Sequence, residues 1–288
     1  MSQSITLSGV THAYATAAGP LPVLDGVSLE MPAGSFTAVV GPSGCGKSTL
    51  TRLVSGLMRP DEGTVALGGE PVRGPRPTVG MAFQNPVLLE WRTIAQNVML
   101  PLEIVGGLPR GQRAERAREL LALVGLEGFE DKRPSELSGG MRQRASLCRA
   151  IAHRPEVLIL DEPFGALDAF TREDLWQTMH DLRRAERFTC VLITHDLREA
   201  VFLSDRTVVF SARPARTQRV VEIDLGGHRS LDDLYAPRAV ELLAELRREI
   251  QTAQGREETP PPLHSSQKNG IPPASRDRIG TRAAEAAR

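Results

Sequence analysis

The most informative segment of the chain is GPSGCGKST, from Gly41 to Thr49, which directly follows the apolar run Phe36–Val40. The spacing G-x-x-x-x-G-K-S between a β-prone run and a helical pattern is typical of a phosphate-binding loop, or P-loop. Its glycines permit backbone conformations that a Cβ forbids, so that successive N–H groups can face a phosphate chain. The predicted nucleotide contacts of this loop are Gly41, Pro42, Ser43, Gly44, Cys45, Gly46, Lys47, Ser48 and Thr49.

The residues after the loop have the spacing of an amphipathic helix packed on a sheet. Its apolar positions are Leu50, Leu53, Val54 and Leu57. The positive end of such a helix points at the bound anion. We therefore expect Lys47 to neutralise the β- and γ-phosphate oxygens and the Ser48 hydroxyl to bind Mg²⁺. A glycine-rich turn that binds nothing is the alternative, which the Gly-Lys-Ser-Thr run in this context disfavours.

A second motif is LSGGMRQR, from Leu137 to Arg144. Ser138-Gly139-Gly140 opens a predicted helix that runs to about His153, so a hydroxyl and bare backbone amides lie at another positive helix end. This arrangement indicates a second binder of a γ-phosphate. Because the P-loop already surrounds its own nucleotide, two such elements favour a head-to-tail dimer. The alternative is that Ser138 only caps its helix.

A pair of carboxylates follows a short buried strand. The apolar run Val157–Leu160 delivers Asp161 and Glu162 at its carboxyl end, where open α/β sheets bind ligands. We expect Asp161 to hold Mg²⁺ through water and Glu162 to polarise the attacking water as general base. The alternative is that the two carboxylates are only charged residues at the end of a strand, without a catalytic role.

With these segments in this order, the chain resembles the ATP-binding cassette (ABC) family of transport ATPases over about residues 5–225. The family signature LSGGQ has Met141 at its fifth position here. The resemblance implies ATP and Mg²⁺ as cofactors and a homodimer in which each signature reaches the partner's ATP. It implies catalytic roles for Gln84, Glu162 and His195, Mg²⁺ ligands at Ser48, Gln84 and Asp161, and further nucleotide contacts at Tyr14, Ser138, Gly139, Gly140 and Asp168.

These further roles each have a place in the family pattern. Tyr14 is expected to stack on adenine, and Gln84 to link the nucleotide site to a membrane partner. Asp168, in a D-loop-like step with Leu167, is expected to contact the opposing subunit. His195 follows the apolar strand 190–194 and is expected to contact the γ-phosphate.

The expected fold is α/β, the P-loop ABC-ATPase fold. It comprises an α/β core sheet, an N-terminal antiparallel β subdomain with turns at Gly19-Pro20 and Pro32–Gly34, and an inserted helical subdomain at about 86–153. The ATPase domain is expected over 1–230 and a C-terminal helix over 231–254. Residues 255–288 read as a disordered tail. Core packing is the expected role of the stripe Ala239, Leu242, Leu243, Leu246 and Ile250.

The charge balance and the cysteines argue against nucleic-acid binding and against a structural metal site. The 288 residues carry 35 basic and 35 acidic side chains, so no overall positive field points to nucleic acid. The cysteines Cys45, Cys148 and Cys190 lack CxxC spacing, which argues for a reducing compartment and against a structural metal. Since Cys45 lies inside the P-loop, alkylation of its thiol is expected to block ATP hydrolysis. A small filler residue is equally compatible with the sequence.

We expect no export leader, since the N-terminal segment is polar, and no apolar run approaches the roughly 20 residues that span a bilayer. A transport ATPase of this kind needs its pore on another chain, so we expect a peripheral subunit at the cytoplasmic face of the cell membrane. Its expected partners are permease subunits and, indirectly, a periplasmic or extracellular solute-binding protein.

Two segments resemble the nitrate, sulfonate and taurine importers within the family. They are FQNPVLLEW, residues 83–91, and SARPAR, residues 211–216, although Glu90 stands where the pattern commonly has Pro. Transporters of pyrimidines or thiamine precursors share much of this pattern. One alternative is a non-transport ABC ATPase acting on DNA or ribosomes, which the lack of coiled-coil insertions and of a second cassette disfavours. The other is an exporter ATPase, against which only the importer-like local features and the separate pore argue.

Overall fold

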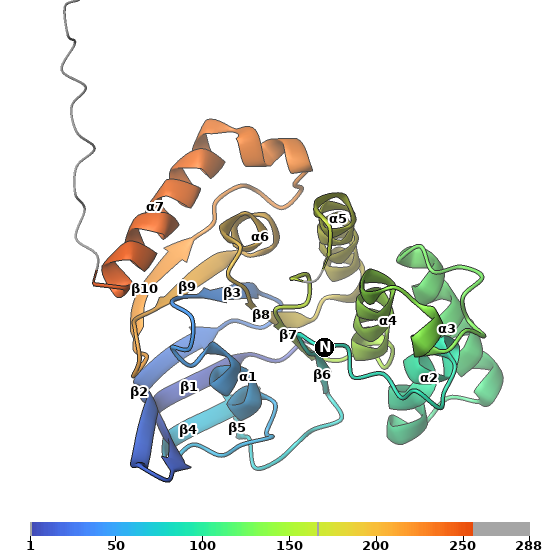
Figure 1. Cartoon of the computed structure of the whole chain (residues 1–288), viewed down its shortest axis with the longest axis horizontal. Coiled ribbons are helices and arrows are strands. Elements are labelled where there is room, and N and C mark those ends of the chain that lie inside the picture. The colour runs from blue at the N-terminus through green and yellow to red at the C-terminus, as the bar shows by residue number, and fades with distance from the viewer. Residues whose placement is uncertain (1, 166, 256–288) are drawn as a thin grey trace, which may run out of the picture. The chain divides into compact units, whose positions relative to one another are not determined.

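The computed structural model describes residues 2–165 and 167–255 of the chain. These residues form an antiparallel sheet, a mostly parallel main sheet and helices that pack around them (Figure 1). This is the α/β architecture that the sequence predicts. The expected tail lies outside the described residues, except for Gly255.

The antiparallel sheet has the strand order β2-β1-β4-β5. Its strands are β1 (Ile5–Thr16), β2 (Gly19–Met31), β4 (Glu62–Leu67) and β5 (Glu70–Pro71). The predicted turn at Gly19-Pro20 is wrong, because Gly19 already begins β2 and the turn consists of residues 17 and 18. β2 is an edge strand, where the missing N–H of Pro20 costs no ladder bond. The predicted turn at residues 32–34 is confirmed.

The main sheet has the order β10-β9-β3-β8-β7-β6, and all neighbours are parallel except β9 and β10. Its strands are β3 (Phe36–Val40), β6 (Val79–Ala82), β7 (Val157–Asp161), β8 (Thr189–Ile193), β9 (Arg206–Phe210) and β10 (Thr217–Glu222). β3 and β8 are buried along their whole length, as expected of parallel strands covered on both faces. The carboxyl ends of β3, β7 and β8 therefore meet at one edge.

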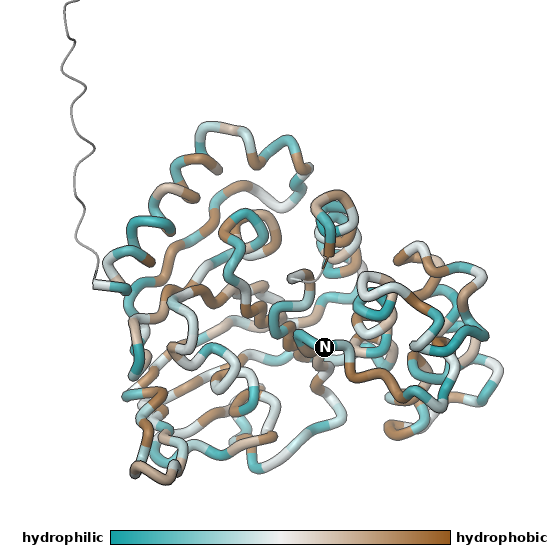
Figure 2. Tube along the Cα trace, in the orientation of Figure 1, coloured by the Kyte–Doolittle hydropathy of each residue, from teal (hydrophilic) through white to brown (hydrophobic). Residues whose placement is uncertain are grey.

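The two faces of the main sheet bury different partners, because side chains alternate along each strand. Val39 and Ile159 share a hydrophobic cluster with helix α1 (Lys47–Val54) and the antiparallel sheet. Ala38 and Leu160 belong to a second cluster with α5 (Ala169–Glu186), α6 (Leu197–Leu203) and α7 (Pro237–Ala253). Figure 2 shows hydrophobic residues concentrated along the strands between these layers.

A group of helices forms a lobe beside the main sheet (Figure 1). It contains α2 (Ile94–Val105), α3 (Arg110–Leu123), the short 3₁₀ turn η1 (Pro134–Glu136) and α4 (Gly139–Ile151). Leu120 and Leu121 of α3 are buried. These helices lie within the expected insertion at about 86–153, whose exact bounds as a subdomain stay a prediction.

The helix after the P-loop is shorter than its apolar pattern predicts. α1 ends at Val54, and Gly56 follows with φ 77°. A Cβ on Gly56 would lie 2.3 Å from the carbonyl carbon and oxygen of Gly74, so the chain turns here against a neighbouring loop. Leu57 is 53% exposed, and its predicted place on the buried stripe is wrong.

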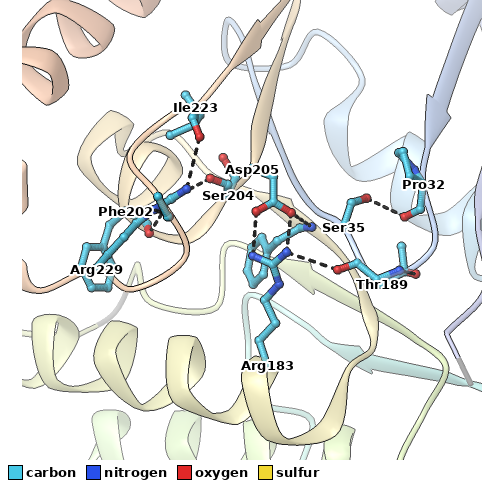
Figure 3. Close-up of polar contacts among 12 residues, drawn as sticks. Pro32, Ser35, Arg183, Thr189, Phe202, Ser204, Asp205, Ile223 and Arg229 are labelled. Atoms are coloured by element: carbon cyan, nitrogen blue, oxygen red, sulfur yellow. Dashed lines mark hydrogen bonds and ion pairs between the residues drawn. The ribbon is translucent and has the colours of Figure 1, made fainter.

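Polar contacts at the ends of strands and helices fasten the layers together (Figure 3). Arg183 near the end of α5 pairs with Asp205, through a bond of 3.0 Å from Nη1 and a second bond from Nη2. Asp205 also accepts the Phe36 N–H of β3 at 2.8 Å. The carboxylate therefore joins α5 to the sheet.

The C-terminal segment is attached to the core by a buried arginine (Figure 3). Arg229 is 4% exposed and donates to the carbonyls of Val201, Phe202 and Ser204 at the end of α6, at 2.7–3.0 Å. The following 3₁₀ turn η2 (Leu231–Tyr235) leads into α7. The predicted core role of the α7 stripe is confirmed, with Ala239, Leu242 and Leu246 buried and Leu243 and Ile250 packed against them.

Candidate nucleotide site

The P-loop connects β3 to α1 and is held in place by its glycines. Gly46 is the N-cap of α1, has φ 127°, and lies where a Cβ would come within 2.8 Å of Val23 Cγ1 and 2.9 Å of a Leu24 methyl. Only glycine fits this position without displacing both side chains. No side chain caps this end of α1, so its first N–H groups remain available to an anion.

Lys47 is folded back over the loop. Its side chain is largely buried, and Nζ donates to the carbonyl oxygens of Gly41 at 2.9 Å and Pro42 at 3.0 Å. Within the described part of the chain, no carboxylate lies within ion-pair distance of Nζ. The ammonium charge is thus uncompensated at the mouth of the loop, which suits a phosphate.

Two hydroxyls of α1 meet the end of β7. Ser48 Oγ donates to Asp161 Oδ1 at 3.2 Å and Thr51 Oγ1 to Oδ2 at 3.4 Å. Burial raises the pKa of Asp161, the Ser48 hydrogen bond opposes this, and the charge of Glu162 raises the pKa further. Oxygen ligands and a carboxylate whose ionised form is disfavoured both fit a small divalent cation, which would restore the charged form.

Of the three predicted catalytic residues, Gln84 and His195 both approach one carboxylate oxygen of Glu162. Gln84 Nε2 donates to Glu162 Oε2 at 3.1 Å, and His195 Nδ1 lies 3.4 Å from the same atom. They come from the chain just beyond β6, β7 and β8. Glu162 itself has φ 48°, a left-handed conformation that a non-glycine residue adopts at a cost. Its N–H donates to the Ile193 carbonyl at 2.9 Å, which helps to hold that conformation.

The predicted signature residues lie on the helical lobe. Ser138 is the N-cap of α4 and accepts the Met141 N–H at 3.3 Å. Over residues 2–165 and 167–255, no hydrogen bond or ion pair connects Ser138–Gly140 with residues 41–49. Asp168 caps α5 by accepting the Thr171 N–H at 3.0 Å, and this hydrogen bond lowers its pKa. Their contacts with a second subunit stay predictions.

Tyr14 of β1 lies beside the start of α1. Its hydroxyl is 3.2 Å from Thr49 Oγ1 and accepts from Arg52 Nη1 at 3.3 Å, while the His12 ring packs edge-on at 5.1 Å between centroids. Sequence reasoning missed Arg52, His12 and Thr51. Of these, Thr51 carried a signal, because it lies one helical turn after Ser48 on the same face of α1.

Cys45 occupies a different environment from the one expected. It is 1% exposed within the apolar cluster that contains Val23 and Phe210, and burial raises the pKa of its thiol although Lys47 lowers it. A reactive cysteine needs solvent access and a lowered thiol pKa, whereas Cys45 is buried and its thiol pKa is raised. The expectation that its alkylation blocks hydrolysis therefore loses its basis, and the filler interpretation fits the structure.

We expect iodoacetamide at pH 7.5 to modify Cys45 at least about tenfold more slowly in the folded protein than in denaturant. Mass spectrometry of the peptide containing residues 41–49 over time measures this. A model peptide with the same segment supplies the intrinsic rate. Modification of the folded protein at the peptide's rate would contradict the buried position.

An apolar groove lies between the main sheet and the helical lobe. Its volume is about 450 Å³, and its walls include Phe83, which directly precedes Gln84, and Ile104 and Val105 at the end of α2. Ile104 is 75% exposed. Among the described residues, none of the helices combines the length and apolarity that crossing a bilayer requires.

Comparisons with known proteins agree with this geometry. Residues 24–165 match a family model described as ABC transporter. The chain is 45% identical over 211 residues to the bicarbonate transport ATP-binding protein CmpD of Synechocystis sp., which covers 73% of this chain and 75% of that protein. It is 41% identical over 208 residues to the aliphatic sulfonates import ATP-binding protein SsuB of Bacillus licheniformis, covering 72% and 80%. A dimeric ATP-binding cassette bound to ADP and Pi in a post-hydrolysis state matches with a TM-score of 0.70 and 30% identity, over 76% of this chain and 98% of that one.

Proposed function

This chain belongs to the ABC transporter family of ATP-binding proteins, which hydrolyse ATP to drive transport, and we propose that it is the ATPase subunit of an importer for a small solute. Support for import comes from the names of its relatives, which refer to bicarbonate transport and to import of aliphatic sulfonates. Small anions are therefore the first solutes to test. The pyrimidine and thiamine-precursor classes remain the next.

In the proposed cycle, two copies enclose two ATP molecules. Lys47 and the N-terminus of α1 hold the phosphates of one ATP, and Ser138–Gly140 at the N-terminus of α4 approach the same ATP from the partner. The N-termini of α1 and α4 are two separate anion-binding helix ends, which supports this division. Among the described residues, no hydrogen bond joins the two ends within one subunit. The dimeric state of the matching cassette structure supports it as well.

For hydrolysis, we propose that Glu162 polarises the attacking water. Gln84 and His195 hold its Oε2 and thereby fix the carboxylate that accepts the proton. Ser48 and Asp161, with Gln84, would hold Mg²⁺, which neutralises charge on the β- and γ-phosphates. The convergence of two side chains, Gln84 and His195, on one carboxylate oxygen of Glu162 is the observation that carries the assignment.

We propose that the groove lined by Phe83, Ile104 and Val105 receives a cytoplasmic helix of a membrane permease. The groove is apolar, and Phe83 links it directly to Gln84 at the nucleotide site. Closure of the ATP-bound dimer can then move the permease, and hydrolysis resets the pair by removing the γ-phosphate that joined its halves.

Affinity purification tests the proposed assembly. The tagged full chain is isolated from its native membranes in mild detergent, and its stoichiometric partners are identified by mass spectrometry. Recovery of a multi-span permease, together with solute uptake that is lost on deletion of the chain, supports the importer. Recovery with ribosomes or DNA and without a permease would overturn it.

Replacing Ile104 by aspartate is expected to reduce recovery of the permease at least about tenfold, because a charge would be desolvated in the groove. The yield of permease per mole of tagged chain measures this effect. The matched control is Val240→Asp on α7, where the side chain is 53% exposed outside the groove. Equal recovery with the two variants contradicts docking in the groove.

A further inference from the structure

A small cavity lies directly behind the catalytic pair Glu162–His195. Its volume is about 20 Å³, and its walls come from the segment after β7, from the first turn of α5 and from the junction of β8 with α6. The lining residues are Glu162, Phe164, Gly165, Arg172, Thr194, His195, Asp196 and Glu199. A cavity of this size holds one water molecule when polar partners are present.

Two lining residues supply such partners. Glu199 is 3% exposed, and its Oε1 has no hydrogen-bond partner among the protein groups, although burial removes it from bulk solvent. Arg172 Nε is also buried without a protein partner. Buried polar atoms left in this state are costly, and one water in the cavity would give both a hydrogen-bond partner.

Both side chains also contact residues next to His195. Thr194 Oγ1 donates to Glu199 Oε2 at 2.6 Å and accepts the Asp196 N–H at 2.9 Å. Arg172 Nη1 lies 3.3 Å from Asp196 Oδ2, and Nη2 donates to the Leu167 carbonyl at 2.9 Å. Glu199 and Arg172 therefore bind the side chains of the two residues that flank His195, Thr194 and Asp196.

We propose that Glu199 is a positioning residue for ATP hydrolysis: together with Arg172 it binds one buried water that supports the Glu162–His195 pair from behind. This inference rests on the proposed role of Glu162 as general base. Glu199 touches neither nucleotide nor attacking water and acts only through the geometry of that pair.

The protonation state of Glu199 follows from its surroundings. Burial raises its pKa to about 8, and the charges of Asp196 and Glu162 add to this effect, while the Thr194 hydrogen bond and Arg172 oppose it. At pH 7 the group is a neutral acid that can donate to the water. When it ionises above pH 8, a third negative charge appears beside Glu162 and Asp196, the donor is lost, and turnover falls.

Kinetics of the full chain test the inference. Glu199→Gln keeps the shape and a donor but cannot ionise, whereas Glu199→Leu removes both polar atoms. Ser204→Ala is the matched control, because it deletes a buried hydrogen bond of 2.6 Å at the other end of α6, outside the cavity. For each variant, kcat and the KM for ATP are measured between pH 6 and pH 9, with thermal unfolding as the folding check.

For Glu199→Leu we expect kcat about tenfold below wild type with a KM within about twofold, as for a misplaced catalytic group. For Glu199→Gln we expect retention of most turnover at pH 7 and a kcat ratio to wild type that rises at least about threefold from pH 7 to pH 9. Ser204→Ala should lower only the unfolding temperature.

A pH profile of Glu199→Gln parallel to that of wild type overturns the inference, even where Glu199→Leu fails to fold. A Glu199→Leu kcat equal to that of Ser204→Ala does so too. Glu162→Gln in the same assay distinguishes failure of the proposed function from failure of this inference. If Glu162→Gln keeps full turnover, the assignment of Glu162 as general base has failed. If Glu162→Gln is inactive while the pH profile of Glu199→Gln parallels that of wild type, only the role of Glu199 is lost.

Discussion

Glu162→Gln is expected to lower ATP turnover at least about 10²-fold while ATP binding persists, the scale expected for loss of one positioned catalytic group. The amide keeps the size of the side chain and a partner for Gln84, but it cannot accept a proton from water. Because the left-handed backbone at this position is held by the Ile193 carbonyl, the substitution leaves the loop in place. Single-turnover hydrolysis and equilibrium ATP binding separate the two effects.

The matched control is Glu156→Gln, which removes a carboxylate just before the amino end of the same strand, β7. It should hydrolyse ATP at nearly the wild-type rate. Near-normal turnover in Glu162→Gln itself would refute the assigned base and move attention to His195.

Lys47→Ala should weaken ATP binding itself, by roughly 10- to 100-fold. Hydrogen bonds to charged groups contribute about 1.5–3 kcal/mol, and every 1.4 kcal/mol changes a dissociation constant tenfold. The substitution removes the uncompensated ammonium at the mouth of the loop and its two bonds to the Gly41 and Pro42 carbonyls. Titration calorimetry with a non-hydrolysable ATP analogue and Mg²⁺ measures the loss.

Lys132→Ala provides the comparison, because Lys132 is a half-exposed lysine that pairs with Glu136 on the helical lobe. Its affinity for ATP should match wild type. If Lys47→Ala also bound ATP like wild type, the phosphate-cradle assignment would fail.

Much of this molecule could be predicted because its main elements are encoded locally. The P-loop needs glycines at fixed spacing, and the continuous apolar runs of β3, β7 and β8 are typical of parallel strands buried on both faces. Parallel strands end at a common edge, so the residues that follow them, Glu162 and His195, could be expected to meet.

The sequence was a poor guide where contacts between distant segments determine the end of a helix or the surroundings of a side chain. The helical spacing extends through Leu57, but the close approach of Gly74 to Gly56 ends the pattern before it. The sequence left the role of Cys45 open between a reactive thiol and a filler, and only the fold shows that its thiol lies in an apolar cluster. Glu199 and Arg172 were missed altogether, because they lie on separate helices and only the fold brings them to one cavity.

Helix α5 connects the cavity behind Glu162 and His195 with the amino end of β3. Its 18 residues span about 27 Å at 1.5 Å per residue. One end begins at Asp168 and carries Arg172 behind the catalytic pair, and the other end is clamped through Arg183 to Asp205 and the Gly34 carbonyl. A helix fixed at both ends would couple Asp168, the residue expected to contact the opposing subunit, to the amino end of β3.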